Sequence, residues 1–230
     1  FAVPLAFVGM MFFAIGFALG INSFLIPVLK GALSLPSGVA YLLLAATFVP
    51  FLIFGYPASA TIAKIGYKRT MALSFLIFAV AFILFVLSAK LENFILFLIA
   101  SFVSGAANAY LQASVNPYIT ILGPIESAAK RMSIMGICNK LAWPVAPLFF
   151  ALVVADQTNV QTSDLYLPFY IIIGVFLLLG IISLMAPLPE VKAAGEDESD
   201  TANCPYAANK TSIWQFPHLV LGALTLFIYV

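Results

Sequence analysis

The stretch LQASVNPYITILGP, residues 111–124, ends an apolar segment yet carries Gln112, Asn116 and Pro117 close together. The same segment holds more polar side chains upstream, at steps of three and four residues. The residues of this polar stripe are Ser101, Ser104, Asn108, Gln112 and Asn116. Such steps keep side chains on one face of a helix, here within an arc of about 120°. A polar stripe on a membrane-spanning helix must face protein or water, so this helix is predicted to line a polar path.

The composition indicates that the segment does lie in a membrane. Of the 230 residues, 63% are hydrophobic and 8% are charged, whereas soluble domains average roughly 45–50% and about 25%. Such a chain is typical of a protein that crosses the bilayer several times. The net charge of +1 gives no basic surface, so we expect no nucleic-acid partner. Because all Asp and Glu residues lie outside the apolar segments, we expect no enzyme, no metal site and no cofactor.

Six complete apolar segments follow one another, and each reaches the ~20 residues that a spanning helix requires. They cover residues 1–29, 39–63, 71–89, 93–122, 132–155 and 166–185, and a seventh starts near residue 214. The sequence therefore predicts an all-α membrane protein with a six-helix transmembrane bundle in residues 1–186. Residues 187–213, which include the acidic run GEDESD, are predicted to form a cytoplasmic central loop. Residues 214–230 are predicted to begin helix seven.

The distribution of Lys and Arg predicts the orientation of these helices. The loops on one side carry only Lys30 and Lys90, whereas the loops on the other side carry many more. Those residues are Lys64, Lys68, Arg69, Lys130, Arg131, Lys192 and Lys210. By the positive-inside rule, the loops rich in Lys and Arg, and the N-terminus with them, are expected in the cytoplasm.

A short internal similarity suggests a repeat of three helices. INSFLIP, residues 21–27, aligns with LQASVNP, residues 111–117, so that Asn22 falls on Gln112 and both stretches end in Pro. The first and fourth segments then occupy equivalent places in two inverted repeats, an arrangement known in transporters. The third and sixth segments are apolar all round. This pattern predicts a 3+3 plan in which the first and fourth segments line the path.

The two ends of the chain also carry information. The chain begins with Phe, already inside apolar sequence. Its last apolar stretch, residues 216–230, covers about 22 Å at ~1.5 Å per residue, short of the roughly 30 Å hydrocarbon core. We therefore expect this chain to be a fragment that a missing C-terminal half completes.

Several stretches carry a family resemblance. IGYKR, residues 65–69, lies where the major facilitator superfamily has its cytoplasmic signature loop. Residues 22–33 (NSFLIPVLKGAL), 111–124 and 127–150 (SAAKRMSIMGICNKLAWPVAPLFF) resemble the fucose–galactose–glucose permease branch of that superfamily. The resemblance implies the N-terminal half of a twelve-helix fold. It also implies a sugar symporter of the bacterial inner membrane that works by alternating access.

The resemblance further implies a gating role for the loop that holds Gly66, Lys68 and Arg69. In the superfamily this loop usually reads Gly-x-x-x-Asp-Arg-x-Gly. Its fixed places are occupied here by Ser59, Ala63, Lys64 and Gly66. The Asp that pins the inward gate is therefore missing from this chain.

A second departure concerns the coupling ion. Proton-coupled fucose permeases have an Asp after the Asn of helix one and a Glu where Gln112 stands, but this chain has Ser23 and Gln112. Neither side chain exchanges a proton near neutral pH. The chain resembles the glucose/galactose members more, and proton coupling through these two positions is not expected. The coupling ion, sodium or a proton, stays open.

Neutral amides suit a sugar, because a carboxamide both donates and accepts hydrogen bonds as hydroxyls do. Gln112 lies about 16 Å from the cytoplasmic end of its helix, near the bilayer middle where transporters bind substrate. With it, Asn22, Asn116 and Asn139 are predicted to contact the sugar. The alternative is hydrogen bonding between helices, worth roughly 0.6 kcal/mol on average. Asn116 has a further alternative, which is to bond carbonyls freed at Pro117.

Lys140 lies about 12 Å inside the fifth segment, and no acidic residue lies in any complete segment to pair with it. An unpaired ammonium at this depth costs roughly 2.5–3.5 kcal/mol. We predict that Lys140 lines the path and donates to a sugar hydroxyl or to an acceptor of the C-terminal half. The alternative is that its side chain extends back to the cytoplasmic interface. Trp143, on the same face, is predicted either to stack on a sugar ring or to anchor a helix interface.

Together these features predict a secondary active transporter of a neutral hexose, glucose or galactose before fucose. Its expected partners are the sugar, a coupling ion, the lipid bilayer and the C-terminal half. Two alternatives remain, a membrane sugar sensor without transport and a transporter of another small polar solute. A measurement of sugar flux distinguishes a sensor from a transporter, because a sensor binds sugar but does not accumulate it in vesicles.

Overall fold

The computed structural model describes residues 2–154, 161–186, 215–217, 220–222 and 224–225. The chain divides into two compact units, Phe1–Val191 and Lys192–Val230. In the second unit a helical turn is described, in which the N–H of Val220 donates to the carbonyl of Phe216 at 3.2 Å. The predicted central loop, 187–213, and much of the predicted start of helix seven lie outside the described residues.

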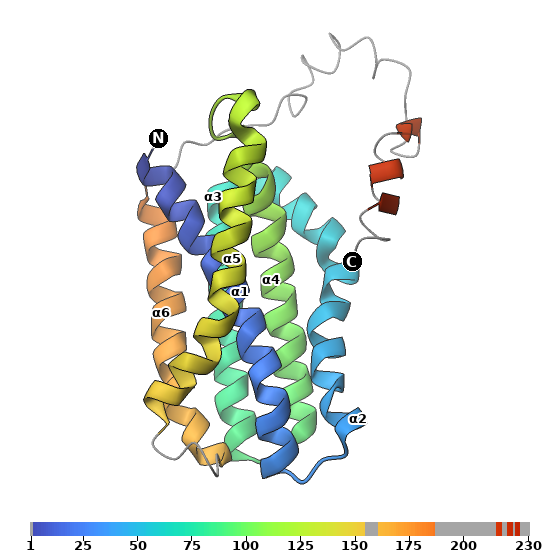
Figure 1. Ribbon diagram of the computed structural model, residues 1–230, viewed down its shortest axis with the longest axis vertical. Coiled ribbons are helices and arrows are strands. Elements are labelled where there is room, and N and C mark those ends of the chain that lie inside the picture. The colour runs from blue at the N-terminus through green and yellow to red at the C-terminus, as the bar shows by residue number, and fades with distance from the viewer. Residues whose placement is uncertain (1, 155–160, 187–214, 218–219, 223, 226–230) are drawn as a thin grey trace. The chain divides into compact units, whose positions relative to one another are not determined.

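The first unit is built from helices, and its described residues contain no strand. Its long helices are α1 (Ala2–Ala32), α3 (Leu42–Lys90), α4 (Phe94–Ile121), α5 (Ala128–Val153) and α6 (Tyr166–Met185), and its short ones are α2 (Ser37–Ala40), η1 (Ile125–Ser127) and η2 (Thr162–Leu165). Figure 1 shows the long helices side by side in a bundle. Five helical stretches of the described chain are long and apolar enough to cross a membrane. The all-α membrane fold is thus confirmed.

α3 accounts for two of the six predicted spans. As one rod its 49 residues would measure about 74 Å, more than twice the roughly 30 Å hydrocarbon core. Gly66 interrupts the helix with φ 83° and ψ 169°, a conformation that favours glycine. Figure 1 shows the chain rising from α2 and then returning through the bundle, so residues 42–65 and 67–90 form two arms. The structure differs from the predicted loop in that helix continues on both sides of Gly66.

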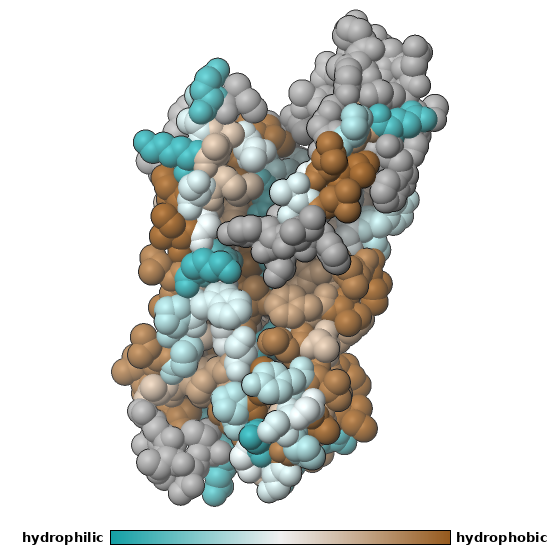
Figure 2. Space-filling model, turned by 45° about the vertical axis from the view of Figure 1, so that its right-hand side comes forward, coloured by the Kyte–Doolittle hydropathy of each residue, from teal (hydrophilic) through white to brown (hydrophobic). Residues whose placement is uncertain are grey.

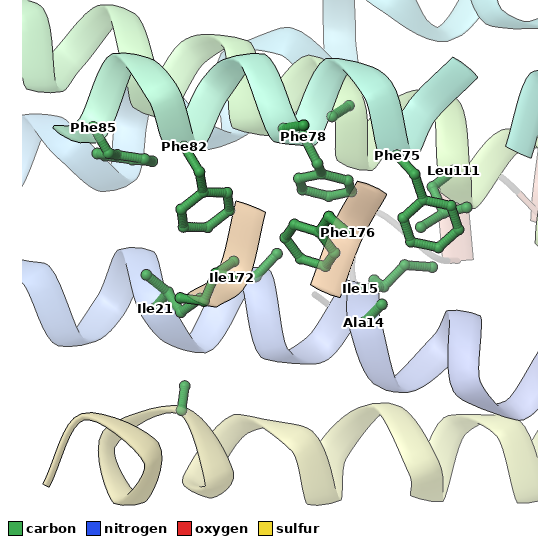
Figure 3. Close-up of a cluster of buried hydrophobic side chains, with 14 of the residues drawn as sticks. Ala14, Ile15, Ile21, Phe75, Phe78, Phe82, Phe85, Leu111, Ile172 and Phe176 are labelled. Atoms are coloured by element: carbon green, nitrogen blue, oxygen red, sulfur yellow. The ribbon is translucent and has the colours of Figure 1, made fainter. Parts of the chain in front are cut away.

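Aromatic side chains hold the second arm of α3 against α6. Phe75, Phe78, Phe82 and Phe85 recur at steps of three and four and so share one face. Figure 3 shows this row of rings beside Phe176 of α6. The rings of Phe78 and Phe176 stack with centroids 4.8 Å apart, and such pairs contribute about 0.5–1.5 kcal/mol beyond area burial. The third and sixth spans therefore bury one apolar face against each other.

Glycines bring two other pairs of spans into close contact. A Cβ on Gly16 of α1 would overlap the carbonyl of Asn139 on α5, and the next turn, at Gly20, is also tight. In the same way, a Cβ on Gly105 of α4 would overlap the carbonyl of Thr47 in the first arm of α3. The first span thus packs on the fifth as the fourth packs on the second. This is the pairing expected for two repeats of three helices.

The outer surface of the first unit is largely apolar. Large hydrophobic side chains are exposed on all the long helices. On the face drawn in Figure 2, brown hydrophobic side chains cover much of the surface, interrupted by white and teal patches. Such a surface suits contact with lipid tails over most of its area.

Candidate functional site

A pocket of about 160 Å³ lies between α1, α4 and α5. Its lining residues are Phe12, Ile15, Gln112, Asn116, Gly136, Asn139 and Lys140. The four polar residues among them were all predicted from the sequence to contact substrate. α1 supplies apolar side chains, whereas α4 and α5 supply amides and an ammonium group. An apolar wall with a few convergent polar groups is the usual composition of a small-molecule site.

α4 presents Gln112 and Asn116 to the pocket from successive turns of one face. Both side chains are half-buried. The sequence left open that Asn116 bonds a carbonyl near Pro117. Pro117 lacks the N–H that would pair with the carbonyl of Ala113, so Ala113 is the residue this alternative concerns. The Thr120 hydroxyl donates to a different group, the Pro117 carbonyl, at 2.7 Å, and the alternative for Asn116 stays a prediction.

α5 contributes the opposite wall. The Asn139 Nδ2 donates to the carbonyl of Phe12 on α1 at 3.0 Å, which fixes the side chain at the edge of the pocket. A carboxamide has a second N–H and an oxygen beyond this bond. Gly136, three residues earlier, has no described atom from outside its own stretch of helix within 4 Å of the position that a Cβ would take, so this wall leaves room for a ligand.

Lys140 is exposed, and its Nζ lies 5.5 Å from the centroid of the Trp143 ring. This distance is within the range of a cation–π interaction, worth about 0.5–1 kcal/mol at an exposed site. The Trp143 ring is half-buried, and its Nε1 has no hydrogen-bond partner among the described residues. The pocket lining includes Lys140 but not Trp143. Trp143 thus contacts a residue of the pocket without lining the pocket itself.

The structure does not bring Asn22 into this pocket. Asn22 is 1% exposed, and its Nδ2 donates to the Ser104 hydroxyl on α4 at 3.4 Å. This is the helix–helix bond that the sequence left as the alternative. Ser101 and Asn108 are equally buried, and within the described chain their side chains have no hydrogen-bond partner. The polar stripe therefore has two parts, a buried part between helices and a part that lines the pocket.

The residues of the predicted gating loop lie apart from the pocket. Gly66 forms the break in α3, and Lys68 and Arg69 follow in the first turn of its second arm. Lys68 is half-buried and Arg69 is exposed. The structure shows their place at the reversal of the chain, and their gating role stays a prediction.

Sequence reasoning missed Arg131 as a site residue and counted it only as a loop charge. Arg131 is 9% exposed, and its guanidinium donates to carbonyls at the end of α4. The available signal was its position in the first turn of the helix that follows ILGP. The preceding helix ends at ILGP, and the last carbonyls of a helix need donors from outside it.

Two other features of the first unit do not suggest a sugar site. A cavity of about 300 Å³ between α1, α5 and α6 is lined by apolar side chains, including Met10, Phe17, Phe149 and Val175. It offers no side-chain group that could bond hydroxyls. Over the described residues, no group of three or more His, Cys, Asp or Glu side chains comes together as a metal site would require.

Comparisons with known proteins show the family and the fold of this chain. The family model described as Major Facilitator Superfamily matches residues 7–230. A glucose/galactose transporter of Brucella abortus is 33% identical over 96% of this chain and 53% of the relative. The L-fucose-proton symporter of Escherichia coli is 23% identical over 100% of this chain and 57% of its own. A putative glucose/galactose transporter of Helicobacter pylori is 28% identical over 96% of this chain and 54% of the relative.

A solved structure has the same fold. The transporter FucP of this superfamily, in the outward conformation, matches with a TM-score of 0.71 and 23% sequence identity, over 90% of this chain and 54% of that chain. At this identity the likeness shows the fold, and it confirms the predicted N-terminal half. The chain spans about half the length of the curated relatives it matches.

Proposed function

This chain belongs to the major facilitator superfamily, and we propose that the intact protein moves a neutral hexose across the bacterial inner membrane by alternating access. The observation that carries this proposal is the pocket where Gln112, Asn116, Asn139 and Lys140 meet. The three amides both donate and accept hydrogen bonds, the Lys140 ammonium only donates, and the set includes no carboxylate. Such a set suits a ligand with many hydroxyls and no charge of its own.

Glucose or galactose is preferred over fucose for two reasons. The relative named as a glucose/galactose transporter is 33% identical to this chain, whereas the relative named as an L-fucose-proton symporter is 23% identical. The uncharged Gln112 and Ser23 also stand where the resemblance places carboxylates in proton-coupled fucose permeases. Under this proposal the coupling ion is sodium or a proton, and a proton is not carried by these two positions.

The proposal assigns only one half of the transport machinery to these residues. The described pocket has walls from α1, α4 and α5, and we place the facing wall in the C-terminal half. The N-terminus and the reversal at Gly66 lie on the cytoplasmic side in this proposal, as the Lys and Arg distribution suggests. The isolated 230 residues are therefore expected to show no flux.

Counterflow in vesicles that contain the full-length protein tests the proposal. Vesicles loaded with unlabelled glucose are given a trace of labelled glucose, with and without sodium and with and without a pH gradient. We expect transient accumulation of label, with competition by galactose stronger than by fucose. Binding of glucose without counterflow would favour the sensor. Failure of every hexose to bind or compete would favour a different polar solute.

A further inference from the structure

Arg131, in the first turn of α5, is a buried cation without an acidic partner among the described residues. It is 9% exposed, and its guanidinium donates to neutral oxygens. The acceptors are the carbonyls of Ile119 (3.1 Å), Thr120 (3.1 Å) and Pro124 (2.9 Å) and the hydroxyl of Ser127. A buried charge is tolerated only when such hydrogen bonds replace water. Three segments, the end of α4, the connection and the start of α5, therefore meet at one side chain.

These bonds complete the C-terminal end of α4. The last four carbonyls of a helix have no partner within it. In α4 the Tyr118 carbonyl accepts from Leu122 N at 2.9 Å, and the Ile121 carbonyl accepts from Gly123 N at 2.8 Å. The two carbonyls between them are those that accept from Arg131. A cation at this end also interacts favourably with the helix dipole.

The bonds matter for the pocket because α4 and α5 carry its two polar walls and pack little on each other. α5 packs mainly on α1, and α4 mainly on α3. Ile119 is three residues past Asn116, about 4.5 Å along the axis, and Arg131 is five residues before Gly136, about 7.5 Å. Arg131 thus joins the two walls within about two turns of the pocket.

We propose that Arg131 is a positioning residue for the sugar pocket. It sets the separation of the amides on α4 from Asn139 and Lys140 on α5, and it does so without touching the ligand. This inference rests on the proposed sugar site. It requires a guanidinium rather than any cation, because only the planar fork presents five N–H donors in fixed directions to both helices.

The test measures equilibrium binding of labelled glucose to the purified full-length protein, per mole of folded protein. Arg131→Lys keeps the charge but loses the fork, and we expect about tenfold weaker binding. Lys130→Gln is the matched control, because it removes a charge from the exposed neighbouring side chain, and we expect a change of less than twofold. If Arg131→Lys gives no folded protein, Ser127→Ala is measured instead, because it removes one acceptor of the guanidinium. Weakening of glucose binding by more than twofold would support the inference, and a smaller change would overturn it.

A double-mutant cycle separates positioning from stability alone. If Arg131 holds Gln112 in register, Gln112→Ala weakens binding much less in the Arg131→Lys protein than in the wild type. An equal effect of Gln112→Ala in both backgrounds, or unchanged glucose affinity in Arg131→Lys, would overturn this inference alone. Failure of the wild type to bind glucose or galactose would overturn the proposed function and this inference with it.

Discussion

α5 and α6 are both largely uncovered in this half of the bundle, yet their open faces differ. α6 exposes large apolar side chains along its length, among them Leu178 at 56%. α5 also exposes large apolar side chains, among them Ile137 at 59% and Leu148 at 61%, but it adds Gly136, Lys140 and Pro144. Of the five described stretches that can cross a membrane, the one that contains α5 is the least apolar and the least buried.

This difference shows that a helix face can be exposed in one half of a membrane protein for two reasons. A face of Leu and Ile is suited to lipid, whereas a face with an ammonium, glycine and proline is suited to water or to another protein segment. The exposed fraction alone does not separate these cases, but the composition of the open face does. Under the proposed function, the open face of α5 therefore belongs to the substrate path and that of α6 faces lipid.

The largest expected effect comes from adding a charge to each face. Leu178→Lys on α6 is expected to cost roughly 2.5–3.5 kcal/mol, because the ammonium enters hydrocarbon. Ile137→Lys on α5, at nearly equal exposure, is expected to cost much less if this face borders the proposed aqueous path. The yield of full-length protein inserted in the membrane measures both. Equal losses would contradict the assignment of the two faces.

A smaller effect is expected from helix contacts. Gly16→Ala places a Cβ against the Asn139 carbonyl, so α1 and α5 must separate. Overpacking of this kind costs about 1–3 kcal/mol, and the upper part of that range is expected because the obstacle is backbone. Gly174→Ala on α6 is the control, since no other described part of the chain lies within 4 Å of its Cβ position. A thermal unfolding series in detergent that shows equal midpoints would refute the close contact of α1 with α5.

The two parts of the polar stripe give the next comparison. Gln112→Ala removes an amide that lines the pocket, and it is expected to weaken sugar binding by about 1–3 kcal/mol through groups left unpaired. Ser101→Ala removes a buried hydroxyl away from the pocket, and sugar affinity is expected to stay unchanged. A binding titration measures both variants. Equal weakening would show that the whole stripe serves packing.

The smallest effect is expected for Lys140→Met, which keeps the length of the side chain and removes its charge. Loss of one exposed donor and of the contact with Trp143 is expected to weaken sugar binding by roughly 0.5–1 kcal/mol, with membrane insertion unchanged. If Lys140 instead faces lipid, the variant inserts better and binds sugar as before. Transport rates over pH 6–9 together with insertion yields distinguish these outcomes.

The sequence predicted the span count and the polar path because both depend on local patterns. Runs of apolar residues define spans, and steps of three and four define the face that carries Gln112 and Asn116. It could not predict how the stripe divides along its length. Residues on one face share a direction, but α1 covers the N-terminal part of the stripe, where Asn22 bonds Ser104, and leaves Gln112 and Asn116 to line the pocket. That division depends on where a distant helix lies.

Arg131 was missed for a related reason. A Lys-Arg pair between two apolar segments looks like a solvated loop, and the positive-inside rule treats both charges alike. In the structure Lys130 is exposed and Arg131 is buried. The distinction depends on the direction in which the first turn of α5 presents each side chain toward the end of α4. Only the three-dimensional packing of the two helices fixes that direction.

The hydrogen bond from Asn139 to Phe12 joins residues 127 positions apart in the chain. Translation adds roughly 5–20 residues per second, so α1 waits about 6–25 s before its main neighbour leaves the ribosome. Meanwhile α3 and α4, which are consecutive, can already pair. The order of assembly therefore differs from the order of synthesis. A ribosome that stalls before Asn139 is therefore expected to leave a packed α3–α4 pair and an α1 whose glycine face has no partner from α5.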